Sequence, residues 1–207
     1  MAEPSTPGRL RLAELAASLS LATDLGLGHP LEQALRSTIV ATALGRLAGL
    51  APGELCVTYY VSLLRAIGCT STAHDVAALV GDALAFNSWF DKVDVASDRQ
   101  AMGAMLRNVG KGEQPLRRLL MIARMLSGGR GMREGSRIHC EVGRLLCDEL
   151  GLPDGVREGF GQIFERWDGR NAWPGERIGK DIHVGVRIRT SPTTSRRSIA
   201  TKGNRVR

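Results

Sequence analysis

Apolar residues recur at helical spacing along most of this chain, in segments that glycine and proline separate. Residues 10–24 place their leucines on one broad helical stripe. Pro30 suits the first turn of a second helix, which we expect to run to about residue 50. A third, strongly apolar helix is predicted at about 54–67. No segment alternates apolar and polar residues as a strand would, so the pattern predicts an all-α protein.

The same pattern continues in the rest of the chain, without a repeat of fixed period. Further helices are predicted at 73–86, 98–109, 114–127, 134–150 and 153–166. The 207 residues are 43% hydrophobic but only 4% aromatic, which fits one domain with a mostly aliphatic core. No stretch approaches the ~20 apolar residues of a membrane span. Residues 1–9 contain no apolar run, so we expect a flexible N-terminus, no signal peptide and a cytoplasmic protein.

The net charge of +7 comes from the end of the chain. Residues 184–207 hold seven basic residues and no acid, which equals the whole excess of 28 Lys and Arg over 21 Asp and Glu. The preceding body is therefore neutral. A DNA-binding protein is suggested only by this tail, and no helix-turn-helix pattern supports it, so we do not expect nucleic acid as a partner.

Two segments in the C-terminal half resemble known motifs. One is HCEVG at 139–143, followed by LGLP at 150–153. The other is FERWDGRNAWP at 164–174, followed by Gly179 and Ile182. They are similar to the H-P-x-I-G and H-H-E-R-W-D-G-x-G-Y-P elements of the HD-GYP family, in the order that this family has them.

The N-terminal half extends the resemblance in the same order. Gly28-His29-Pro30 resembles the segment of the family's first histidine, and LLRAIGC at 63–69 stands in the place of L-L-H-D-I-G-K. The similarity covers about residues 19–182. The amino-acid sequence of these motifs resembles an actinobacterial subgroup of the family, in which such a domain often precedes a helix-turn-helix regulator. The resemblance implies an HD-superfamily helical bundle.

The family's chemistry implies a divalent metal centre, usually iron or manganese, that hydrolyses a cyclic dinucleotide such as cyclic di-GMP. Only His29 and His139 match metal ligands of that centre. The other expected donors and the catalytic lysine fall at residues with different chemistry: Leu25, Arg65, Ala66, Cys69, Ile163 and Phe164. Ala66 has no ligand atom, and Arg65 would bring a permanent positive charge to a cation site. Two remnant imidazoles cannot hold a catalytic metal pair, so we expect weak metal binding or none.

The best-matched block is Glu165, Arg166, Trp167, Asp168 and Gly169. The resemblance implies that this loop helps to recognise the ligand. From the residues alone, we expect a helix to end at Asp168-Gly169, with Trp167 buried against the helix that carries His139. One extra residue between Asp168 and Pro174 departs from the family pattern.

These observations favour a degenerate HD-GYP-like signalling domain that acts by binding or by protein contact. The partners would be a cyclic dinucleotide or nucleotide, a protein or a second copy of the chain, and not a membrane. The alternative is an active metal-dependent phosphohydrolase on a cyclic dinucleotide or nucleotide.

The predicted organisation has three parts: a flexible segment at 1–9, the HD-GYP-like domain at 10–183 and a basic, low-complexity tail at 184–207. The tail is polar and basic and is expected to be disordered. With GC-rich codons, a one-base shift from Thr190 onward yields an acidic, helix-competent segment that resembles the family's next element. A frameshift that truncates the domain is therefore our hypothesis for the tail.

Overall fold

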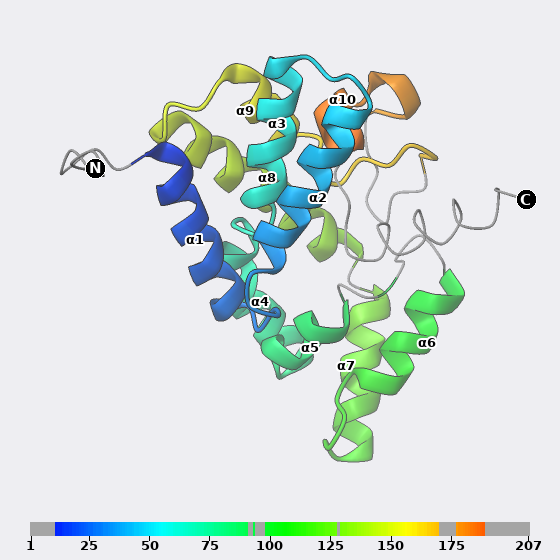
Figure 1. The fold of residues 1–207 in the computed structure, drawn as a ribbon. Coiled ribbons are helices and arrows are strands. Elements are labelled where there is room, and N and C mark those ends of the chain that lie inside the picture. The colour runs from blue at the N-terminus through cyan, green and yellow to red at the C-terminus, as the bar shows by residue number, and fades with distance from the viewer. Residues whose placement is uncertain (1–10, 91–92, 94–97, 128, 170–176, 189–207) are drawn as a thin grey trace, which may run out of the picture.

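A computed structural model describes residues 11–90, 93, 98–127, 129–169 and 177–188. These residues form helices and no strand, so the predicted all-α fold is confirmed for the part of the chain described. The bundle is shown in Figure 1. The helices are α1 Leu12–Gly26, α2 Gln33–Leu47, α3 Pro52–Leu63, α4 Cys69–Val80, α5 Ala83–Phe90, α6 Asp98–Asn108, α7 Pro115–Ser127, α8 Gly129–Glu149, α9 Asp154–Phe160, the 3-10 turn η1 Gly179–Asp181, and α10 Val184–Arg187.

Several predicted boundaries differ from the structure for local reasons. The helix predicted at 73–86 is two helices, because Gly81 at the end of α4 adopts φ +85°. Glycine takes this conformation without the steric cost that a side chain would bring. The third and last predicted helices end earlier, at Leu63 and Phe160, and continue as turns.

The predicted tail begins too early. Val184–Arg187 form α10, whose N-cap His183 accepts a hydrogen bond from the Gly185 amide. Val186 is 5% exposed and belongs to the main core. The predictions of a flexible N-terminus at 1–9 and of a disordered, frameshifted tail beyond residue 188 refer to segments that lie outside the described residues.

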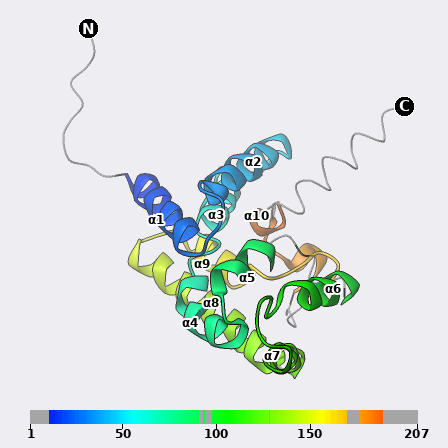
Figure 2. The same cartoon turned by 90° about the horizontal axis from the view of Figure 1, so that it is seen from below.

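The main core surrounds α3, which packs against α1, α2, α9 and α10 (Figures 1 and 2). Close packing depends on two small residues. A Cβ on Gly159 of α9 would lie 2.9 Å from a methyl of Val61, and one on Gly185 of α10 would lie 2.9 Å from the carbonyl oxygen of Glu54. Phe160 is fully buried at the centre of this cluster. The core therefore holds α9 and α10 directly on α3.

A second, smaller cluster lies under α6 and α7. It consists of Val80, Val109, Met121 and Met125, with partly buried neighbours such as Trp89. Figure 1 shows α6 and α7 projecting from the body of the bundle. None of the helices in the described ranges is both long and apolar enough to cross a membrane.

Candidate functional site

The end of α3 and the start of α4 lie against His139 of α8. A Cβ on Gly68 would lie 2.5 Å from the backbone oxygen of His139, so this contact requires glycine. The Sγ of Cys69 lies 3.5 Å from Nδ1 of His139, which is 3% exposed. The ring of His139 also meets Phe164 edge-on, with centroids 4.9 Å apart. Three positions that the family resemblance assigns to one catalytic centre are thus in contact.

The neighbouring positions of that centre offer little to a metal ion. Ala66 is 6% exposed and Ile163 is 1% exposed, and neither carries a donor atom. Arg65 is half-buried at the end of α3. A guanidinium keeps its charge at every physiological pH, so it opposes a second cation nearby.

His29 lies in a separate buried pair with a residue that the sequence analysis missed. Its side chain is 6% exposed, and its Nδ1 lies 3.5 Å from Oδ1 of Asp24, whose side chain is 2% exposed. The other oxygen of Asp24 accepts the Ala34 amide at 3.0 Å. The family resemblance placed the expected acidic ligand at Leu25, which is 74% exposed. Asp24 lies on the inward face of α1, next to the buried Ser20 and Thr23, and the available signal was an acidic residue one position before Leu25.

The residues present do not fit a two-metal centre. Within the described ranges, no three His, Cys, Asp or Glu side chains gather in a way that could hold a metal ion. Burial raises the pKa of the Cys56 thiol, and it raises the pKa of Cys147 to about 11. Burial therefore favours the neutral form of both thiols.

The loop after α9 presents the best-matched motif to solvent. Arg166 donates to both carboxylate oxygens of Asp168, at 3.1 and 3.2 Å, and Gly169 completes the turn at φ +65°. Trp167 is 60% exposed, so the prediction that it is buried against α8 is wrong. The helix ends at Phe160 and places Trp167 beyond the core. The Trp167 ring instead lies 5.7 Å from the guanidinium carbon of Arg187.

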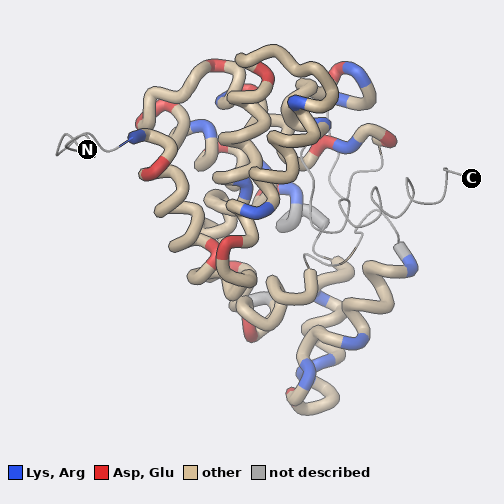
Figure 3. Tube along the Cα trace, in the orientation of Figure 1, with Lys and Arg blue, Asp and Glu red and all other residues tan. Residues whose placement is uncertain are grey.

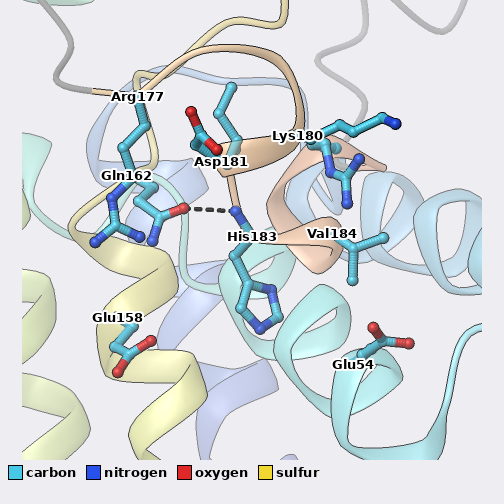
Figure 4. A pocket seen from close by; sticks show the side chains of 10 residues that line it. Glu54, Glu158, Gln162, Arg177, Lys180, Asp181, His183 and Val184 are labelled. Carbon is cyan, nitrogen blue, oxygen red and sulfur yellow. Dashed lines mark hydrogen bonds between the residues drawn. The ribbon is translucent and has the colours of Figure 1, made fainter.

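Arg187 also lines a cavity of about 390 Å³ between α3, α9 and α10 (Figure 4). The imidazole ring of His183 points into this cavity. The backbone amide of His183 donates a hydrogen bond to Oε1 of Gln162 at 2.6 Å. The charged residues that line the cavity balance: Arg177, Lys180 and Arg187 against Glu54, Glu158 and Asp181. This cavity was not predicted from the sequence, because Arg187 was assigned to the basic tail.

The cavity and the His139 centre lie at opposite ends of α3. Glu54 lines the cavity from the first turn of α3, whereas Ala66 follows its last turn. At 1.5 Å per residue, the axis from Glu54 to Leu63 spans roughly 14 Å. Trp167 lies next to the cavity through its contact with Arg187.

Comparisons with known proteins give one informative similarity. No family model matches the chain, and no solved structure matches it. The chain is 27% identical over 179 residues to the 3'3'-cGAMP-specific phosphodiesterase 3 of Vibrio cholerae serotype O1. The aligned part covers 86% of this chain but only 38% of that protein. The described part of the chain is therefore all-helical, and the chain is similar, over most of its own length, to part of a cyclic-dinucleotide phosphodiesterase.

Proposed function

We propose that this chain is a degenerate HD-GYP-like signalling domain that binds a cyclic dinucleotide or nucleotide without hydrolysing it. The observation that carries the proposal is the chemistry at the end of α3. There His139 contacts Cys69 and Phe164, and the buried neighbours Ala66 and Ile163 have no donor atoms. The similarity to a cyclic-dinucleotide phosphodiesterase supports the ligand class.

Hydrolysis of a phosphodiester in this family depends on metal ions, which would generate a hydroxide and neutralise developing charge on the phosphate. The separated Asp24–His29 and Cys69–His139 pairs do not provide the ligand set for two such ions. These residues therefore do not support a metal-dependent step of hydrolysis. What remains is a surface that can recognise a ligand.

The proposed ligand surface comprises residues 165–169 together with Arg187 and the adjoining cavity. An exposed indole such as Trp167 offers a flat apolar face on which a nucleobase can stack. Arg187 and Arg177 supply planar donors that suit phosphate oxygens. Both guanidinium groups belong to residues lining the cavity, so a base on Trp167 and a phosphate near Arg187 would be neighbours.

The test is equilibrium binding of 3'3'-cGAMP and cyclic di-GMP to the full chain, by calorimetry. The wild-type protein should bind at least one of them. Trp167→Ala should weaken that binding by roughly 5- to 150-fold, because base stacking contributes about 1–3 kcal/mol per base. Its melting temperature should stay unchanged, since Trp167 is 60% exposed.

Trp89→Phe is the matched control, because Trp89 packs in α5 against Phe86, away from the proposed surface. This variant should keep the wild-type affinity. Absence of binding to wild-type protein, or equal affinity in Trp167→Ala, would contradict the proposed ligand surface.

The second candidate function is an active metal-dependent phosphohydrolase. The similarity to a phosphodiesterase over 86% of the chain favours it. It requires metal ligands beyond the pairs described above. Metal content therefore separates the two functions.

A further inference from the structure

Helix α7 carries two apolar faces, and only one of them is covered by described residues. Met121 and Met125 point inward and are 8% and 7% exposed. On the other side, four leucines are between 53% and 71% exposed: Leu116, Leu119, Leu120 and Leu126. A surface helix of a globular protein ordinarily has one apolar stripe facing the core. The outward stripe is therefore a candidate interaction surface.

The outward residues follow the spacing of a helix-pairing seam. Leu116, Leu119, Ala123 and Leu126 are separated by three, four and three residues, which corresponds to a-d-a-d positions of a heptad repeat. The small Ala123 in this row allows a neighbouring helix to approach closely. The seam runs for most of α7, which spans Pro115–Ser127.

The charges on α7 indicate what kind of helix fits. Arg117 and Arg124 are one residue beyond the seam positions Leu116 and Ala123, and so point about 100° away from them. Leu120 and Ser127, on the flank of the seam, are uncharged. A heterologous partner selected by charge would need charged groups beside the seam. An uncharged, self-complementary row of leucines fits an identical row, as in a two-fold symmetric contact.

We propose that the outward face of α7 docks against α7 of a second copy of this chain. Helices α6 and α7 project from the body of the bundle (Figure 1), and the basic residues of both helices are marked in Figure 3. The contact would bury on the order of 1,000 Å², the low end for specific interfaces, so the dimer should depend on concentration.

The first experiment is sedimentation velocity of the full chain over a range of protein concentrations. Wild-type protein should shift from monomer to dimer as its concentration rises. The double variant Leu119→Glu/Leu126→Glu should raise the dimer dissociation constant more than about tenfold, because the interface would bury unpaired carboxylates. Leu145→Glu is the control, since Leu145 is 59% exposed on α8, and it should dimerise as wild type does.

The second experiment keeps the proposal testable if the double variant unfolds. Ala123→Cys and Arg124→Cys place one new thiol on adjacent, exposed residues that face different sides of α7. A short bismaleimide should link Ala123→Cys into covalent dimers at least about tenfold faster than Arg124→Cys, a ratio that the roughly 100° rotation between the two positions predicts. A wild-type monomer at every concentration, equal cross-linking of both variants, or a monomer that binds vesicles of anionic phospholipid through this face would each overturn the proposal.

Discussion

Replacing Phe160 with alanine should lower the free energy of unfolding by about 3–5 kcal/mol, the usual cost of removing a large core aromatic. Phe160 is fully buried between α3 and α8, and its ring lies against Gly143. Trp167→Ala should change the free energy by less than about 0.5 kcal/mol, as is typical of surface substitutions. Urea denaturation followed by circular dichroism measures both.

The two aromatic residues are only seven positions apart, so they form a close matched pair. The contrast depends on where α9 ends, at Phe160. If Trp167→Ala lowered the free energy of unfolding more than Phe160→Ala does, then Trp167 and not Phe160 would be the core residue.

The second large effect concerns glycine on α8. A Cβ on Gly143 would overlap Cδ1 of Phe160 and lie 2.8 Å from its Cε1. Gly143→Ala should therefore destabilise the protein by about 1–3 kcal/mol, as overpacking does. On the same helix, a Cβ on Gly135 would have its nearest neighbour, a Thr72 methyl, at 4.0 Å.

Gly135→Ala should raise stability by about 0.5–1 kcal/mol, because alanine has the higher helix propensity. The same substitution should thus lower the stability of the protein at Gly143 and raise it at Gly135, on one helix. Thermal melts of both variants beside wild type provide the measurement. Two stabilising substitutions would show that Phe160 does not pack on Gly143.

The helices were predictable because helical periodicity is a local property of sequence. The long segments, such as those of α1 and α7, appear close to their predicted bounds. The break at Gly81 was not recognised, because apolar residues continue on both sides of it. Local periodicity indicates an apolar face but does not reveal where a glycine adopts positive φ.

The candidate site was less predictable, because burial depends on contacts between distant segments. Trp167 was expected in the core from its residue type, yet Ile163 and Phe160 occupy that space. Asp24 was missed because the family resemblance placed the expected acidic ligand at Leu25, whereas the buried acidic side chain is that of the preceding residue. The role of Arg187 depends on the packing of α10 on α3, which the basic composition of the following residues concealed.

We propose that this chain does not hold the catalytic metal pair that the family resemblance implies. The most direct measurement is elemental analysis of protein purified from cells supplied with iron, manganese and zinc. We predict well under one equivalent of these metals per chain, because Ala66 and Ile163 carry no donor atoms and no metal-binding group of three forms in the described residues. A stoichiometric content of two metal ions per chain would contradict the claim and favour the active phosphohydrolase.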